Sequence, residues 1–186
     1  DRDYDTLITE SCDAYDNYGN LIFKYRKNKI PIPILENAVD AFKGAIELTE
    51  SRGAASGSSH KRIRKDGSVS NITVGNKVMS GNIGFMDSGA MIKYCRKTAF
   101  ARKYFDKYKQ GIPFVEKIND LYKELCPDHY SRQKSISEAT DTNYMIGNTV
   151  FTTVTVNDSF RTACHQDAGD FEKGFGGTWK KTRRDR

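Results

Sequence analysis

VFTTVTVNDSFRTACHQD, residues 150–167, is the stretch from which the fold of this chain is predicted. Its first part, residues 150–156, combines Thr and Val with one Phe, the composition of a β-strand. Asp158 and Ser159 then favour a turn, and residues 160–167 are predicted to form a second strand. Because side chains on a strand alternate with a period of two, one face of this second strand carries Arg161, Ala163, His165 and Asp167.

His165 and Asp167 form an H-x-D pair whose side chains, on one strand face, can reach the same metal ion. Two histidines and one carboxylate, with open coordination positions, are typical of non-haem Fe(II) oxygenases. The imidazole would bind in its neutral form and the acid as a carboxylate. An isolated H-x-D also occurs by chance, so a surface histidine beside a turn is the alternative interpretation.

The rest of the chain alternates between helical and strand patterns. We predict strands over residues 21–25 and 78–85, and a helix near residues 100–109. A helix over residues 34–50 has an apolar face made of Leu35, Ala38, Val39, Phe42 and Ile46. A further helix is expected to begin at Pro113 and to stop before Pro127, with Phe114, Val115, Ile118, Leu121, Tyr122 and Leu125 in its core.

Composition limits the class of protein. The chain has 186 residues, enough for one domain, with 37% hydrophobic residues, a net charge of +6 and a pI of about 9.1. This charge permits a nucleic-acid partner without requiring one. Four cysteines without a CxxC pair argue against a zinc finger and, with no apolar run of membrane length and no signal peptide, favour a reducing, cytoplasmic setting.

A basic loop is predicted over residues 51–67, SRGAASGSSHKRIRKDG, where small residues precede a cluster of cations. One interpretation is a solvated loop, and the other is a loop that contacts nucleic-acid phosphates. The cations that would make such contacts are Arg52, Lys61, Arg62, Arg64 and Lys65.

The order of strand, R-T-A-x-H-x-D-x-G-D-F and then G-F-G, over residues 148–176, closely resembles the TET/JBP family. Segments upstream, at residues 51–57, 95–100 and 127–133, resemble viral and phage members. The family consists of Fe(II)- and 2-oxoglutarate-dependent dioxygenases that oxidise the methyl group of thymine or 5-methylcytosine in DNA. A methyl C–H bond is too inert for acid–base catalysis, so cofactors must supply the oxidising chemistry.

The resemblance implies an α+β fold: a double-stranded β-helix (jelly roll, cupin-like) with helices packed outside. It implies that His165 and Asp167 are the first two iron ligands, in a protein that uses 2-oxoglutarate and dioxygen. Arg161 would lie near the bound oxoacid or the base. Asp170 would accept a hydrogen bond from a flipped pyrimidine, the alternative being that it caps the turn after the strand. If the protein is viral, its expected location is the host cytoplasm.

The chain departs from the family after Gly176. The family needs a second histidine and an arginine for 2-oxoglutarate beyond H-x-D, and neither is found at a matching position. His60 and His129 both precede the motif, and Arg183, Arg184 and Arg186 lie in a tail that does not resemble the family. We expect residues 1–147 to be a mixed α/β support region, residues 148–176 the first strands of an incomplete barrel, and residues 177–186 a basic tail that is non-native or disordered. A shifted reading frame, a truncation and a natural short form remain open, and we expect the chain alone to be inactive.

Three functions are compatible with these residues. The first is the front part of a DNA 5-methylpyrimidine dioxygenase. The second is a catalytically dead nucleic-acid-binding derivative of such an enzyme. The third is an oxygenase of the same fold that acts on a substrate other than nucleic acid. The motif around H-x-D favours the first function over the third, whereas the missing ligands favour the second for this polypeptide.

Overall fold

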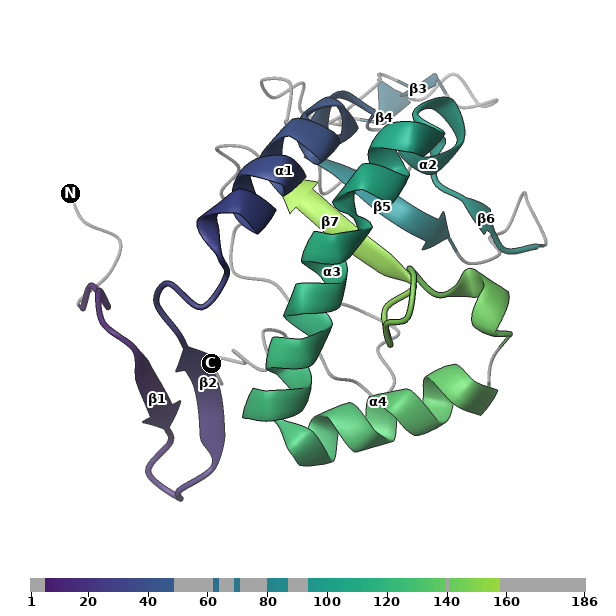
Figure 1. The fold of residues 1–186 in the computed structure, drawn as a ribbon. Helices are drawn as coiled ribbons and strands as arrows, with labels where there is room; N and C mark the ends of the chain where they lie inside the picture. The colour runs from purple at the N-terminus through teal and green to yellow at the C-terminus, as the bar shows by residue number, and fades with distance from the viewer. Residues whose placement is uncertain are drawn as a thin grey trace.

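The computed structural model describes residues 6–48, 62–63, 69–70, 80–86, 94–139 and 141–157. These residues form a mixed helix and sheet structure (Figure 1). Its strands are β1 (Cys12–Tyr15), β2 (Leu21–Tyr25), β3 (Arg62–Ile63), β4 (Val69–Ser70), β5 (Ser80–Met86), β6 (Arg96–Lys97) and β7 (Thr153–Asn157). Its helices are α1 (Ile32–Phe42), α2 (Ala99–Lys103), α3 (Phe105–Leu125) and α4 (Pro127–Ala139), with short 3-10 helices at η1 (Lys43–Glu47) and η4 (Thr142–Tyr144).

The three-stranded sheet has the order β6-β5-β7, and both strand pairs in it are antiparallel. In the longer pair, Ser80 lies opposite Asn157 and Gly84 lies opposite Thr153. Helices α1, α2 and α3 cover one side of this sheet (Figure 1). Strands β1 and β2 form a separate antiparallel hairpin, which Lys24 ties to the end of α3 by donating from Nζ to the Leu125 carbonyl oxygen at 2.6 Å.

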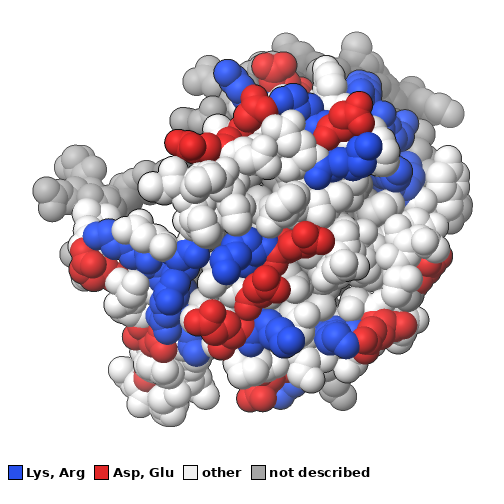
Figure 2. Space-filling model, viewed as in Figure 1, with Lys and Arg blue, Asp and Glu red and all other residues white. Residues whose placement is uncertain are grey.

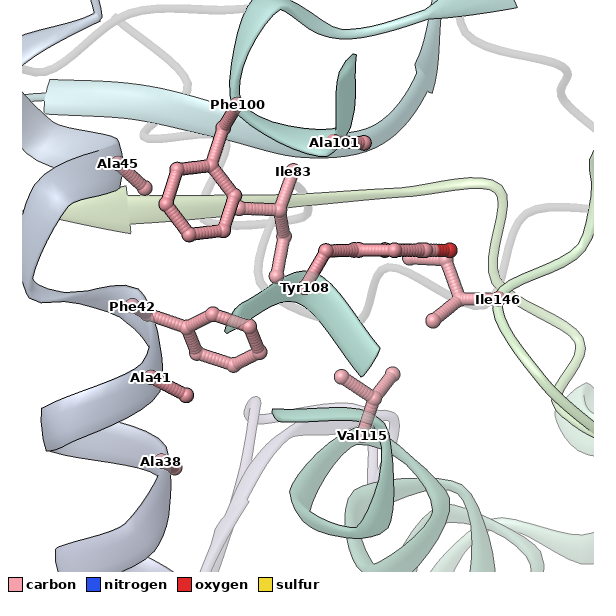
Figure 3. Packing of buried hydrophobic residues seen from close by; sticks show 10 residues of the cluster. All are labelled: Ala38, Ala41, Phe42, Ala45, Ile83, Phe100, Ala101, Tyr108, Val115 and Ile146. Carbon is pink, nitrogen blue, oxygen red and sulfur yellow. The ribbon is translucent and has the colours of Figure 1, made fainter. Parts of the chain in front are cut away.

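The hydrophobic core lies between this sheet and its helices (Figure 3). The Phe42 ring of α1 stands edge-on to Phe100 of α2 and to Phe114 of α3, with ring centroids 6.3 and 6.4 Å apart. Edge-to-face aromatic pairs add stability beyond the area that they bury. The sheet contributes Ile83, which is fully buried, and the half-buried Val154 and Val156 of β7.

Helix α1 was predicted well in position but only partly in its buried face. Ala38, Phe42 and Ile46 are buried as expected, whereas Leu35 is 44% and Val39 is 62% exposed, so the prediction that these two lie in the core is wrong. The members of the core cluster from this part of the chain are instead Ala38, Ala41 and Phe42 of α1 and Ala45 of η1. Small side chains let α1 and α3 approach closely. Alanine has low hydrophobicity, so a hydrophobic pattern in the sequence does not mark these positions as buried.

Helix α3 runs through Pro113, which contradicts the prediction that a helix begins there. The break falls earlier, at Tyr104, between α2 and α3. A proline inside a helix removes one backbone hydrogen bond and normally destabilises it. Here packing against α1 compensates, because Asn37 donates from Nδ2 to the Gln110 carbonyl oxygen at 2.9 Å, and the Gln110 side chain donates back to Asn37 Oδ1 at 3.0 Å.

The remaining predictions of strands, helix ends and fold class are confirmed in part. The strand at residues 21–25 is confirmed as β2, and α3 ends before Pro127 as predicted. The predicted strand at residues 150–156 begins only at Thr153. In the part of the chain that the structure describes, the sheets have two, two and three strands and no closed barrel is present, so the structure bears out helix plus antiparallel sheet but not the jelly roll. The domain division stays a prediction.

Cys12, Cys95 and Cys126, the cysteines inside the described ranges, form no disulfide with one another. Within those same ranges, no helix is both long enough and apolar enough to span a bilayer.

Gly81 allows β5 to touch η1, because a Cβ at this position would lie 1.8 Å from the Ala45 carbonyl oxygen. We expect Gly81→Ala to lower the free energy of unfolding by about 1–3 kcal/mol through forced backbone movement. Gly44→Ala is the matched control, since its Cβ would meet only Phe100 at 3.8 Å. Urea unfolding followed by circular dichroism measures both, and equal effects would contradict the assignment of a close contact to Gly81.

Candidate metal centre

Most of the predicted site residues lie outside the described part of the chain. This applies to His165, Asp167, Arg161 and Asp170, and to four of the basic-loop cations, Arg52, Lys61, Arg64 and Lys65. Arg62 lies in β3, where its backbone pairs with Ser70 of β4. Within the ranges that are described, no group of three or more His, Cys, Asp or Glu side chains could hold a metal. The structure therefore describes the elements that precede H-x-D, and the assignment of His165 and Asp167 as ligands stays a prediction.

Strand β7 precedes H-x-D in the chain, and its two faces differ in polarity. Val154 and Val156 pack against the core beneath the helices. Thr153, Thr155 and Asn157 alternate with them and are exposed. The sheet is therefore apolar toward the helices and polar on its other face.

The polar face is organised by hydrogen bonds across the strand pair. Ser80 Oγ donates to Asn157 Oδ1 at 2.6 Å, and Thr155 Oγ1 donates to Asn82 Oδ1 at 3.1 Å. The Thr153 hydroxyl donates to the Phe85 carbonyl oxygen. Because these bonds join residues 68 to 77 positions apart in the chain, they fix the register in which β7 lies beside β5.

The antiparallel pairing also fixes a direction. Asn157, the last residue of β7, lies opposite Ser80, the first residue of β5. The chain that follows Asn157 toward His165 and the chain that precedes Ser80 are therefore joined to the same end of the sheet. The first contains H-x-D eight residues later, and the second comes from the basic loop.

Helices α3 and α4 hold the segment just before β7. Asn119, which is 5% exposed, accepts a hydrogen bond at Oδ1 from the Val150 backbone N–H at 3.1 Å. Gln133 of α4 donates from Nε2 to the Val150 carbonyl oxygen at 3.3 Å. A turn closes when the Ile146 N–H donates to the Phe151 carbonyl oxygen at 2.8 Å. These contacts position the start of β7, and the sequence contains no signal that singles out Asn119.

An aromatic cluster lies behind this segment. The Tyr122 ring packs on Tyr130 and on Phe151, with centroid distances of 5.7 and 6.0 Å. Burial raises the pKa of Tyr122 to about 12, so its phenol stays neutral at physiological pH. The cluster is structural packing rather than acid–base machinery.

Arg96 of β6 carries a buried hydrogen-bond donor that has no partner among the described residues. Its neighbour Lys97 leaves the strand toward the helices, so Arg96, paired with Met86, leaves toward the polar face. Among the described residues, its Nη1 atom is buried and has no hydrogen-bond partner. A buried guanidinium N–H without an acceptor is costly, and a carboxylate or a phosphate would satisfy it.

The match to known proteins falls on this region. Residues 86–177 match the family model Tet_JBP, described as the oxygenase domain of the 2OGFeDO superfamily. The matched range contains the end of β5, the helices α2 to α4, β7 and the H-x-D motif. Through these residues the chain belongs to the Tet_JBP family of oxygenase domains.

Two similar relatives come from Trypanosoma cruzi and Trypanosoma brucei brucei. The bifunctional helicase and thymine dioxygenase JBP2 of Trypanosoma cruzi is 31% identical over 179 residues, which is 94% of this chain and 15% of that protein. Thymine dioxygenase JBP1 of Trypanosoma brucei brucei is 28% identical over 165 residues, 88% of this chain and 18% of that protein. The chain thus spans less than a fifth of these two relatives. No solved structure matches.

Asn119→Ala should lower the free energy of unfolding by roughly 1–3 kcal/mol, because it leaves the buried Val150 N–H without an acceptor. Asn119→Asp keeps an oxygen at that position and should lose less. Chemical denaturation of both variants tests this, with amide exchange at Val150 as the local readout. Unaltered protection of Val150 in Asn119→Ala would contradict the role given to this contact.

Arg96→Met should leave the free energy of unfolding unchanged or raise it, because the substitution removes a buried donor without a partner. Arg26→Met is the control, since Arg26 pairs with Asp13 at 2.5 Å and donates to the Cys12 carbonyl oxygen at 3.0 Å. That variant should be destabilised. Thermal unfolding compares the two, and a larger loss for Arg96→Met would show that Arg96 serves stability.

Proposed function

We propose that this chain is part of an Fe(II)- and 2-oxoglutarate-dependent dioxygenase that hydroxylates the 5-methyl group of a flipped pyrimidine in DNA. The observation that carries the proposal is the family match over residues 86–177, which includes His165 and Asp167. The names of the relatives favour thymine over 5-methylcytosine as the target. Because the chain covers a small part of those relatives, its activity and substrate are proposals.

The donor set fits the metal. An imidazole nitrogen and a carboxylate oxygen are ligands suited to Fe(II), and in H-x-D they leave a strand on the same side. His165 would bind as the neutral imidazole and Asp167 as the carboxylate. When bound, iron and 2-oxoglutarate supply the oxidising chemistry that a methyl C–H bond requires.

The protein's own part is to hold the base and its backbone. Asp170 would accept a hydrogen bond from N3–H of thymine, and Arg161 would lie near the oxoacid or the base. The basic-loop cations Arg52, Lys61, Arg62, Arg64 and Lys65 would contact phosphates around the flipped nucleotide. The pairing of Ser80 with Asn157 supports this arrangement, because the segments that lead to the loop and to H-x-D are attached at the same end of the sheet.

A jelly roll is the fold that we propose for the whole oxygenase domain. The two-faced pair of β5 and β7 supports it, since a barrel strand carries one face toward an outer helix layer and one toward a polar interior. The three-stranded sheet would be one wall of that barrel.

Fe(II) with 2-oxoglutarate, added without oxygen, should raise the melting temperature of the 186-residue chain. A ligand at a hundred times its dissociation constant adds about 2.7 kcal/mol to the free energy of unfolding. His165→Ala and Asp167→Ala should lose this increase, whereas His129→Ala, on α4, should keep it. Differential scanning fluorimetry measures the effect, and an increase that survives both site variants would refute the assigned ligands.

A catalytically dead nucleic-acid-binding derivative is the second candidate, and the net charge of +6 is compatible with it. The same variants separate the two candidates when mass spectrometry of a thymine-containing duplex is added. Oxidised thymine that depends on His165 supports the enzyme. Duplex binding with no metal-dependent stabilisation and no oxidised base supports the derivative.

A further inference from the structure

The segment of residues 94–109, which forms β6, α2 and the first turn of α3, concentrates positive charge. It contains six Lys or Arg residues and one acidic residue, Asp106. Basic side chains gather over α2 and the start of α3 in Figure 2, at the upper right of the view. We define the β6–α2 surface by its exposed or half-buried members Lys97, Arg102, Lys103, Tyr104, Phe105 and Lys109.

Phe105 organises two of these charges. Its ring, 44% exposed, has Lys97 Nζ at 4.5 Å and Lys109 Nζ at 4.9 Å from its centroid. Each ammonium group is thus within 5 Å of one point, so the two charges lie less than 10 Å apart. Cation–π attraction holds them in place against their mutual repulsion.

Two acidic side chains, Asp106 and Asp40, contact lysines of this segment or its border. Asp106 contacts Lys109 at 3.2 Å, but its side chain is 96% exposed, and such ion pairs are weak in water. Asp40 contacts Lys107 at 2.6 Å, to one side of the surface. A polyanion on the β6–α2 surface would relieve the repulsion between Lys97 and Lys109.

The aromatic side chains indicate which polyanion fits. Platforms for single-stranded nucleic acid present free ring faces on which bases stack. Phe105 instead has ammonium groups against its ring, and the Tyr104 ring leans on Phe100 at a centroid distance of 5.7 Å. The surface therefore offers point charges on ordered elements rather than stacking faces, which suits the phosphates of a duplex.

We propose that the β6–α2 surface binds the sugar-phosphate backbone of duplex DNA, at a distance from the base that is modified. This inference rests on the proposed function, in which DNA is the substrate. Lys97 leaves β6 on the helix side of the sheet, whereas the polar face of β5 and β7 lies on the other side. Contacts on this surface would add affinity without reading the sequence.

The test is fluorescence anisotropy of a labelled duplex with the 186-residue chain, without iron or 2-oxoglutarate, over about 50–200 mM KCl. Each phosphate contact contributes about −0.9 to the slope of log K against log salt. Lys97→Gln with Lys109→Gln should therefore make the slope shallower by about 2 and weaken binding several-fold at low salt. The matched control is Lys123→Gln with Lys134→Gln, which removes two exposed lysines from α3 and α4 and should leave the slope unchanged.

Equal slope changes for the two pairs would overturn the proposal, because they would mean that net charge alone attracts DNA. Preference for anionic phospholipid vesicles over the duplex would overturn it as well. Lys97-dependent DNA binding by a chain that Fe(II) and 2-oxoglutarate do not stabilise through His165 would refute the proposed function and leave this surface standing. Stabilisation that depends on His165, with DNA binding indifferent to Lys97 and Lys109, would do the reverse.

Discussion

The close approach of strand β5 to the helical layer is the constraint on which the described structure depends. Gly81 lies against the backbone of η1, where there is no room for a Cβ. Ile83, the next residue of β5 on the same face, is fully buried in the core. On the same strand, Ser80 and Asn82 bond to β7. One seven-residue strand thus fixes both how near the helices lie and where the strand that precedes H-x-D runs.

Helices α1 and α3 also lie close together because a small residue stands at their contact. A Cβ at Gly111 would lie 2.0 Å from the Phe42 ring, so the absence of a side chain lets the ring sit on the helix. This packing, together with the Asn37–Gln110 amide pair, explains why α3 continues past Pro113. Tertiary contact here overrides a local preference that would otherwise end the helix.

Features that depend on neighbouring residues could be predicted from the sequence, whereas features that depend on contacts between distant segments could not. The strand composition of β2 and β7 and the stop before Pro127 are local properties, and they were predicted within a few residues. The buried face of α1 was not predicted correctly, because the buried Ala38 and Ala41 have low hydropathy whereas the exposed Leu35 and Val39 have high hydropathy. The partnership of Asn119 with Val150, like the buried Nη1 atom of Arg96, depends on contacts between distant segments that no spacing rule encodes. The family was recognisable because the motif around His165 is dense and ordered.

The pairing of β5 with β7 has a consequence for how the chain folds during synthesis. About seventy residues separate the two strands, whereas α3 and α4 are built from local contacts. Local elements form early and distant pairings late, since closing a long loop costs entropy before it brings any contact. The helices would therefore form before β7 pairs with β5. Until the ribosome has released residues 153–157, β5 exposes an edge that another chain could occupy, which makes this interval the point at which chaperones would matter most.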